Sequence, residues 1–125
     1  MNPLVLIPIG CVAAGGAIGA LLRYAAVQLA THLQGSNFPL GTMLVNIAGS
    51  FAIGLLMGRY LQADSEAARL FFVTGVLGGF TTFSAFSWDA LQMLHRGQMG
   101  AAFFYIGGSV IFSLFAVAVG FIAGR

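Results

Sequence analysis

The sequence contains an uncharged, mostly apolar stretch at residues 70–88, LFFVTGVLGGFTTFSAFSW. A helix needs about 20 apolar residues to cross the hydrocarbon core of a bilayer, so this stretch is long enough to span a membrane. It is a poor continuous helix, because Gly78 and Gly79 weaken helix propensity and two β-branched threonines follow them. The pattern favours either a span with a break in the backbone or an unbroken helix that packs closely at its glycines.

Three further stretches also lack charged side chains, at residues 1–22, 24–58 and 97–124. The second of these stretches contains a polar turn at residues 34–39. We expect a single four-helix transmembrane domain over residues 1–125, with short loops and with helices near residues 4–31, 39–61, 67–95 and 98–124.

The composition indicates that lipid is the solvent for most of the chain. Of the 125 residues, 59% are hydrophobic and only 6% are charged, and the mean hydropathy is +0.97. Soluble domains carry about a quarter charged residues. The basic residues are not clustered, so no nucleic-acid partner is expected, and the short loops leave no room for an extramembrane active site. We expect an all-α membrane protein that conducts or carries a solute, and not an enzyme.

The arginines give almost no bias in orientation. Four spans place both termini on one side, which would carry Arg59, Arg69 and Arg125, while Arg23 and Arg96 lie on the other side. A protein with a strong topology shows a clear excess of Lys and Arg in its cytoplasmic loops. The near-equal tally is compatible with insertion both ways round and pairing as an antiparallel dimer. It is equally compatible with one orientation set by the translocation machinery or by a dominant arginine.

Small residues recur at four-residue spacing in three of the spans. They are Gly15 and Gly19, then Ser50, Gly54 and Gly58, and finally Ala116, Gly120 and Gly124. This spacing lets helix backbones approach each other closely in lipid. It predicts a compact bundle that oligomerises, with a solute pathway between subunits.

Aromatic and amide side chains within the spans are candidates for that pathway. Phe80, Phe83 and Phe86 share one helix face. Such a stripe usually faces lipid or packs the core, but the positive ring edges could also attract an anion. Asn46 lies mid-span, where its amide must bond either to another helix or to an anion.

Hydroxyl groups and two charges complete the candidates. Tyr105, Ser109 and Ser113 lie four residues apart and form a hydroxyl stripe that favours a polar path. Arg23 ends the first uncharged stretch, where it could extend to the interface or gather anions in an electropositive vestibule. Asp89 is either a functional acid or an interfacial cap. No acid lies deep in the first, second or fourth span, so these groups favour a small anion.

Three motifs together resemble the Fluc (CrcB-like) fluoride channels. They are GALLRY at residues 19–24, preceded by Gly15 and Gly16; GTMLVN at residues 41–46; and the most specific, GGFTTFSAFS, at residues 78–87. The resemblance covers essentially the whole chain. It implies a fluoride-selective passive channel that exports fluoride across the bacterial plasma (inner) membrane and confers fluoride resistance. It also implies an antiparallel dual-topology homodimer with two pathways and a broken third helix.

The resemblance also assigns roles to individual residues. The fluoride pathway would comprise Thr42, Asn46, Phe83, Phe86, Tyr105, Ser109 and Ser113. Arg23 would lie near the aqueous vestibule, and the main-chain carbonyls of Gly78 and Thr81 would hold a structural Na+ at the centre of the dimer. Three residues depart from the family pattern, namely Asp89 where Glu is common, Ala85 where Thr is common and Phe80 where Leu is common.

A small dual-topology multidrug-type exporter, also built from four short helices, is the main alternative. That class uses a deeply buried glutamate in its first span, whereas no acid lies between Met1 and Arg23 in this chain. A non-conducting assembly subunit held together by its small-residue seams is a third class. A measurement of passive anion flux would distinguish the channel from the exporter and from the assembly subunit.

Overall fold

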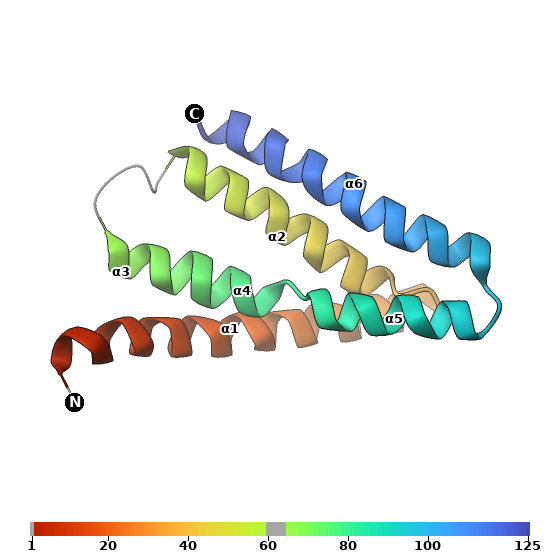
Figure 1. Ribbon diagram of the computed structural model, residues 1–125, viewed down its shortest axis with the longest axis horizontal. Helices are drawn as coiled ribbons and strands as arrows, with labels where there is room; N and C mark the ends of the chain where they lie inside the picture. The colour runs from red at the N-terminus through yellow and green to blue at the C-terminus, as the bar shows by residue number, and fades with distance from the viewer. Residues whose placement is uncertain (1, 60–64) are drawn as a thin grey trace.

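The computed structural model describes residues 2–59 and 65–125, and this part of the chain consists of helices and short connections (Figure 1). The first, second and last spans are α1 (Pro3–Gln34), α2 (Leu40–Arg59) and α6 (Met99–Gly124). The third span runs through α3 (Glu66–Arg69), the π-helix η1 (Leu70–Leu77), α4 (Gly78–Phe80) and α5 (Phe83–His95). All four spans are long and apolar enough to cross a membrane.

The prediction of an all-helical chain with four membrane-spanning helices is therefore confirmed. The helices begin and end within a few residues of the expected bounds, and residues 60 and 61 of the expected second span lie outside the described residues. α1 is capped at its start by Asn2, whose Oδ1 accepts the N–H of Leu4 at 3.1 Å. It is capped at its end by Gly35, whose φ of 65° lies in the left-handed region that glycine adopts readily.

The spans are arranged as two pairs (Figure 1). α2 lies along α6, and α1 lies along the first half of the third span. Beyond the break, α5 contacts α6 and α2 instead. The N- and C-terminal ends lie at the same end of the bundle, as an even number of spans requires.

Close backbone approach at glycines joins α1 to the third span. A Cβ atom on Gly15 would collide with the carbonyl oxygen of Phe71, and a Cβ atom on Gly79 would lie 2.5 Å from the carbonyl oxygen of Gly16. Neither backbone could give way cheaply, because both belong to packed helices. The predicted role of Gly15 in tight helix packing is confirmed.

A second glycine seam joins α2 to α6. A Cβ atom on Gly54 would collide with the carbonyl of Val117, and one on Gly120 would collide with the carbonyl of Phe51. The four-residue spacing in both helices therefore marks their mutual contact, and it fixes α2 as a rigid platform beside the third span.

The third span breaks at Thr81 and Thr82, whose backbones are extended with φ/ψ of −86°/158° and −151°/124°. Thr81 closes the first half, because its N–H and its hydroxyl both donate to the carbonyl of Leu77, at 3.0 and 2.9 Å. Thr82 opens the second half, since its Oγ1 accepts the N–H of Ala85 at 3.1 Å. The predicted break is confirmed, and the unbroken crossover is excluded.

The hydrophobic core lies where α5 meets α2 and α6. Its buried residues are Met43, Ala90, Met93, Ala102 and Tyr105. Many other large apolar side chains of the single chain are exposed. Such a surface suits lipid or further protein rather than water.

Candidate anion pathway at the helix break

The side chain of Asn46 connects α2 to the break in the third span. Its Oδ1 accepts the N–H of Thr82 at 2.7 Å, and its Nδ2 donates to the carbonyl of the same residue at 2.9 Å. The sequence left two partners open for this amide, another helix or an anion, and the structure shows that it bonds to the third span. One Nδ2 hydrogen lies outside these two bonds, since an amide carries two donors.

The guanidinium of Arg23 reaches the break from the opposite side. Its Nε donates to the carbonyl of Gly79 at 2.9 Å, so a cation meets the carbonyl end of the first half-helix. Arg23 ends the first uncharged stretch of sequence, but α1 continues to Gln34. The side chain therefore lies at the level of the break and not at the end of a helix. A vestibule role for Arg23 stays a prediction.

Two carbonyl groups at the break have no hydrogen-bond donor in the part of the chain that the structure describes. They belong to Gly78 and Thr81, the residues expected to hold Na+. Both residues line a common cavity. Unpaired carbonyl oxygens at the break of a membrane helix are suitable ligands for Na+, so the chemistry of these groups fits that ion.

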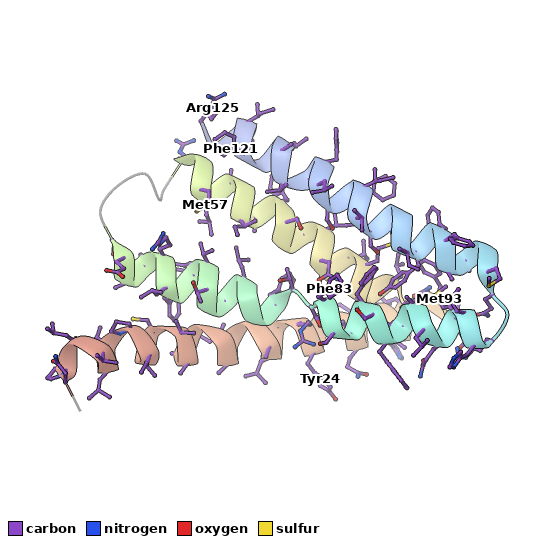
Figure 2. The ribbon with its side chains drawn as sticks, in the orientation of Figure 1. Tyr24, Met57, Phe83, Met93, Phe121 and Arg125 are labelled. Atoms are coloured by element: carbon purple, nitrogen blue, oxygen red, sulfur yellow. The ribbon has the colours of Figure 1, made fainter. Side chains whose placement is uncertain are left out.

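Three aromatic rings form a continuous row beyond the break. The centroid of Phe86 lies 5.5 Å from that of Phe83 and 5.3 Å from that of Tyr105. Figure 2 shows Phe83 at the first turn of α5, directly after the break. Its side chain is 78% exposed in the single chain, so the row begins at the surface and ends in the core.

Tyr105 occupies a different environment from the serines of the same stripe. Its side chain is 0% exposed, and its hydroxyl donates to Oδ2 of Asp89 at 3.1 Å. The hydroxyl of Thr42, also buried, lies beside the Tyr105 hydroxyl. The expected pathway residues therefore fall into two groups, because Tyr105, whose ring packs on Phe86, and Thr42 are not on the wall of the cavity.

An open cavity of about 380 Å³ adjoins the break, between α2, the third span and α6. Of the predicted site residues, its lining brings together Asn46, Gly78, Thr81, Phe83, Phe86, Ser109 and Ser113. Ser109 is 5% exposed, and among the described residues its Oγ is the buried side-chain polar atom without a hydrogen-bond partner. Because native proteins rarely leave such a group unpaired, a ligand or water is expected to meet it.

The whole of this arrangement falls within one family match. The model of the family described as CrcB-like protein, Camphor Resistance (CrcB), matches residues 10–121. The chain belongs to the CrcB-like family. The resemblance seen in the three motifs is thereby confirmed, and so is the conclusion that the chain is a multi-pass membrane protein.

Individual members of the CrcB-like family match nearly the full chain. A protein of Agrobacterium fabrum named fluoride-specific ion channel FluC is 52% identical over 123 residues, which are 96% of this chain and 98% of that protein. A protein of the same name from Thermus thermophilus is 46% identical over 114 residues, which are 90% of this chain and 91% of that protein. A third, from Paracoccus denitrificans, is 46% identical over 91% of both chains.

One residue that is central to the helix break, Thr82, was missed in the sequence. Thr82 supplies the main-chain groups that Asn46 binds and also caps α5. A signal for the cap was present, because a threonine directly before an apolar helical run is a typical helix N-terminus. No local signal indicates the bond to Asn46, since the two residues are 36 positions apart.

Proposed function

We propose that this chain is a fluoride-selective passive channel. Support comes from the relatives named fluoride-specific ion channel, which match this chain over nearly their full length. The observation in this chain that carries the proposal is the buried Ser109 hydroxyl, which has no hydrogen-bond partner among the residues that the structure describes and lies on the cavity wall with the two phenylalanines. An unpaired donor beside aromatic ring edges suits a small anion that accepts strong hydrogen bonds.

The pathway would run along the cavity between α2, α5 and α6. Ser109 and Ser113 offer hydroxyl donors, Asn46 offers its second Nδ2 hydrogen, and Phe83 and Phe86 offer ring edges. None of these groups carries a charge, so fluoride would not be held too tightly to leave. We assign Tyr105 to the support of Phe86, because its ring packs on that ring, and Thr42 to the support of Tyr105, because its hydroxyl lies beside the Tyr105 hydroxyl.

We also propose that two copies assemble as an antiparallel homodimer with two pathways. The cavity is open and Phe83 is 78% exposed in the single chain, so a second copy would be needed to enclose the path from lipid. The carbonyls of Gly78 and Thr81 from both copies would hold a structural Na+ at the centre of the dimer. That ion would neutralise unpaired carbonyl oxygens in a medium without water.

The cellular role that follows is the export of fluoride across the bacterial plasma membrane. Passive export requires no energy coupling, which separates this function from a proton-driven drug exporter. Growth of a bacterium that lacks its own fluoride exporter tests the role. Expression of this chain should restore growth in fluoride medium, and the Phe86→Ala variant should not. Equal growth with and without the chain would contradict the proposal.

Labelling of single cysteines at the two ends of the chain tests the topology. In a Cys11→Ser background, both ends should react partly from each side of the membrane. Reaction from one side alone would contradict the antiparallel dimer while leaving fluoride conduction open.

A further inference from the structure

We propose that Asn46 is a positioning residue, which holds the break of the third span at Thr82 and thereby sets the orientation of Phe83 and Phe86. The effect on fluoride selectivity rests on the proposed function. The effect on the break does not, because it follows from the two hydrogen bonds alone.

The pairing at Thr82 requires an amide. Thr82 presents an N–H and a carbonyl, and Asn46 answers with an acceptor at 2.7 Å and a donor at 2.9 Å. A carboxylate would offer acceptors only, and a single hydroxyl could not reach both groups in this geometry. The two bonds replace those that the interrupted helix can no longer make.

Asn46 is itself held by a rigid element. Its main-chain carbonyl accepts the Ser50 hydroxyl at 2.7 Å, and α2 is packed against α6 through the glycine seam. Gly49, less than one turn further along α2, lies directly against the methyl group of Thr81. The second span therefore touches both residues of the break, one through contact and the other through hydrogen bonds.

The position of Thr82 determines where the two phenylalanine rings lie, because Thr82 caps the helix that carries them. Its hydroxyl caps α5 at Ala85, and Phe83 follows it directly in the chain. Phe86 comes one turn later and packs against Phe83. Without the amide, the peptide groups of Thr82 would be left unpaired in a medium that offers little water, so the start of α5 would shift to find partners.

The test separates this role from a direct contact between Asn46 and the ion. Three variants are compared in lipid nanodiscs without fluoride. Asn46→Ala removes both bonds. Replacement of the peptide bond before Thr82 by an ester removes the N–H of Thr82 and leaves the Asn46 side chain intact. Thr31→Val is the control, because it removes an exposed hydroxyl-to-carbonyl bond of 2.8 Å in α1, remote from the break.

The main readout is hydrogen exchange at the amide of Ala85, measured by NMR at saturating Na+ because the ester also weakens the Thr81 carbonyl as a ligand. We expect exchange to accelerate about tenfold in Asn46→Ala and to rise in the ester variant, as expected for the loss of hydrogen bonds. The control should exchange as the unmodified protein does. Unchanged exchange in Asn46→Ala would overturn the proposal and leave Asn46 as an ion ligand alone.

A second readout is the ratio of fluoride flux to chloride flux in liposomes. Displaced rings should lower this ratio by about tenfold or more in both break variants. An ester variant with normal exchange and normal selectivity would also overturn the proposal. If Asn46→Ala fails to fold, the ester variant alone tests the positioning role. Absence of fluoride flux in the unmodified protein would contradict the proposed function, while the exchange result would still decide the positioning role.

Discussion

The hydroxyl of Tyr105 donates a hydrogen bond to Oδ2 of Asp89 over 3.1 Å, and this bond joins α6 to α5 at the inner end of the aromatic row. The ring of Tyr105 simultaneously packs on Phe86, 5.3 Å away. A buried phenol therefore fixes both the acid that follows the phenylalanines and the inner ring of the pair. Tyr105 thus supports Phe86, which lines the cavity at the break.

The Tyr105→Phe variant tests this support. It keeps the ring and removes the donor, so the free energy of unfolding in mild detergent should fall by about 1.5–3 kcal/mol, the range for a hydrogen bond to a charged group. Tyr24→Phe is the matched control, because Tyr24 is 66% exposed. Equal stability of the two variants would show that the bond to Asp89 contributes nothing.

Phe86 should act through its ring and not through its volume. Both Phe86→Ala and Phe86→Leu are expected to reduce fluoride flux strongly while the proposed dimer stays intact, because leucine fills space but has no positive ring edge. Phe115→Ala, at a 68% exposed position of α6, is the control and should conduct normally. Restoration of flux by leucine would reduce the phenylalanine pair to packing.

Substitutions of Arg23 test whether its charge or its hydrogen-bond geometry matters. Its Nε donates to the carbonyl of Gly79, and lysine would keep the charge without the planar fork of donors. We expect Arg23→Lys and Arg23→Gln to lower both thermal stability and flux, with lysine the milder of the two. If Arg23→Lys conducts and unfolds like the unmodified protein, the residue serves only as a vestibule charge.

The seam between α2 and α6 should tolerate no added methyl group at Gly120. A Cβ atom there would collide with the carbonyl of Phe51, so Gly120→Ala should destabilise the bundle by about 1–3 kcal/mol. Gly100→Ala, in the same helix with open space around it, is the control. It should be neutral or slightly stabilising, because alanine is the better helix former. A reversed order of the two variants would contradict the packing found at this seam.

Much of the fold could be predicted from local sequence. Charge-free stretches indicate the spans, and four-residue glycine spacing indicates the seam that includes Gly54 and Gly120, because both features depend only on neighbours along one helix. The break could be anticipated as well, since Gly78 and Gly79 precede two threonines. These features are encoded within single elements.

The contacts between elements could not be predicted in the same way. Tyr105 and Ser109 lie on one helix face, yet their depths along α6 differ, so one meets Asp89 and the other meets the cavity. The bond of Asn46 to Thr82 depends on how α2 is rotated against the third span. The end of an uncharged stretch at Arg23 indicates either the interface or a vestibule, while its bond to Gly79 depends on the register of α1.

The most direct test of fluoride conduction is efflux from liposomes that contain the purified protein. Liposomes loaded with fluoride or chloride are diluted into ion-free buffer, a potassium ionophore balances the charge, and ion-selective electrodes follow each anion without a proton gradient. We predict rapid fluoride efflux with chloride efflux near that of protein-free liposomes. Well-folded protein that releases no fluoride, or that releases chloride equally fast, would contradict the proposal of a fluoride-selective channel.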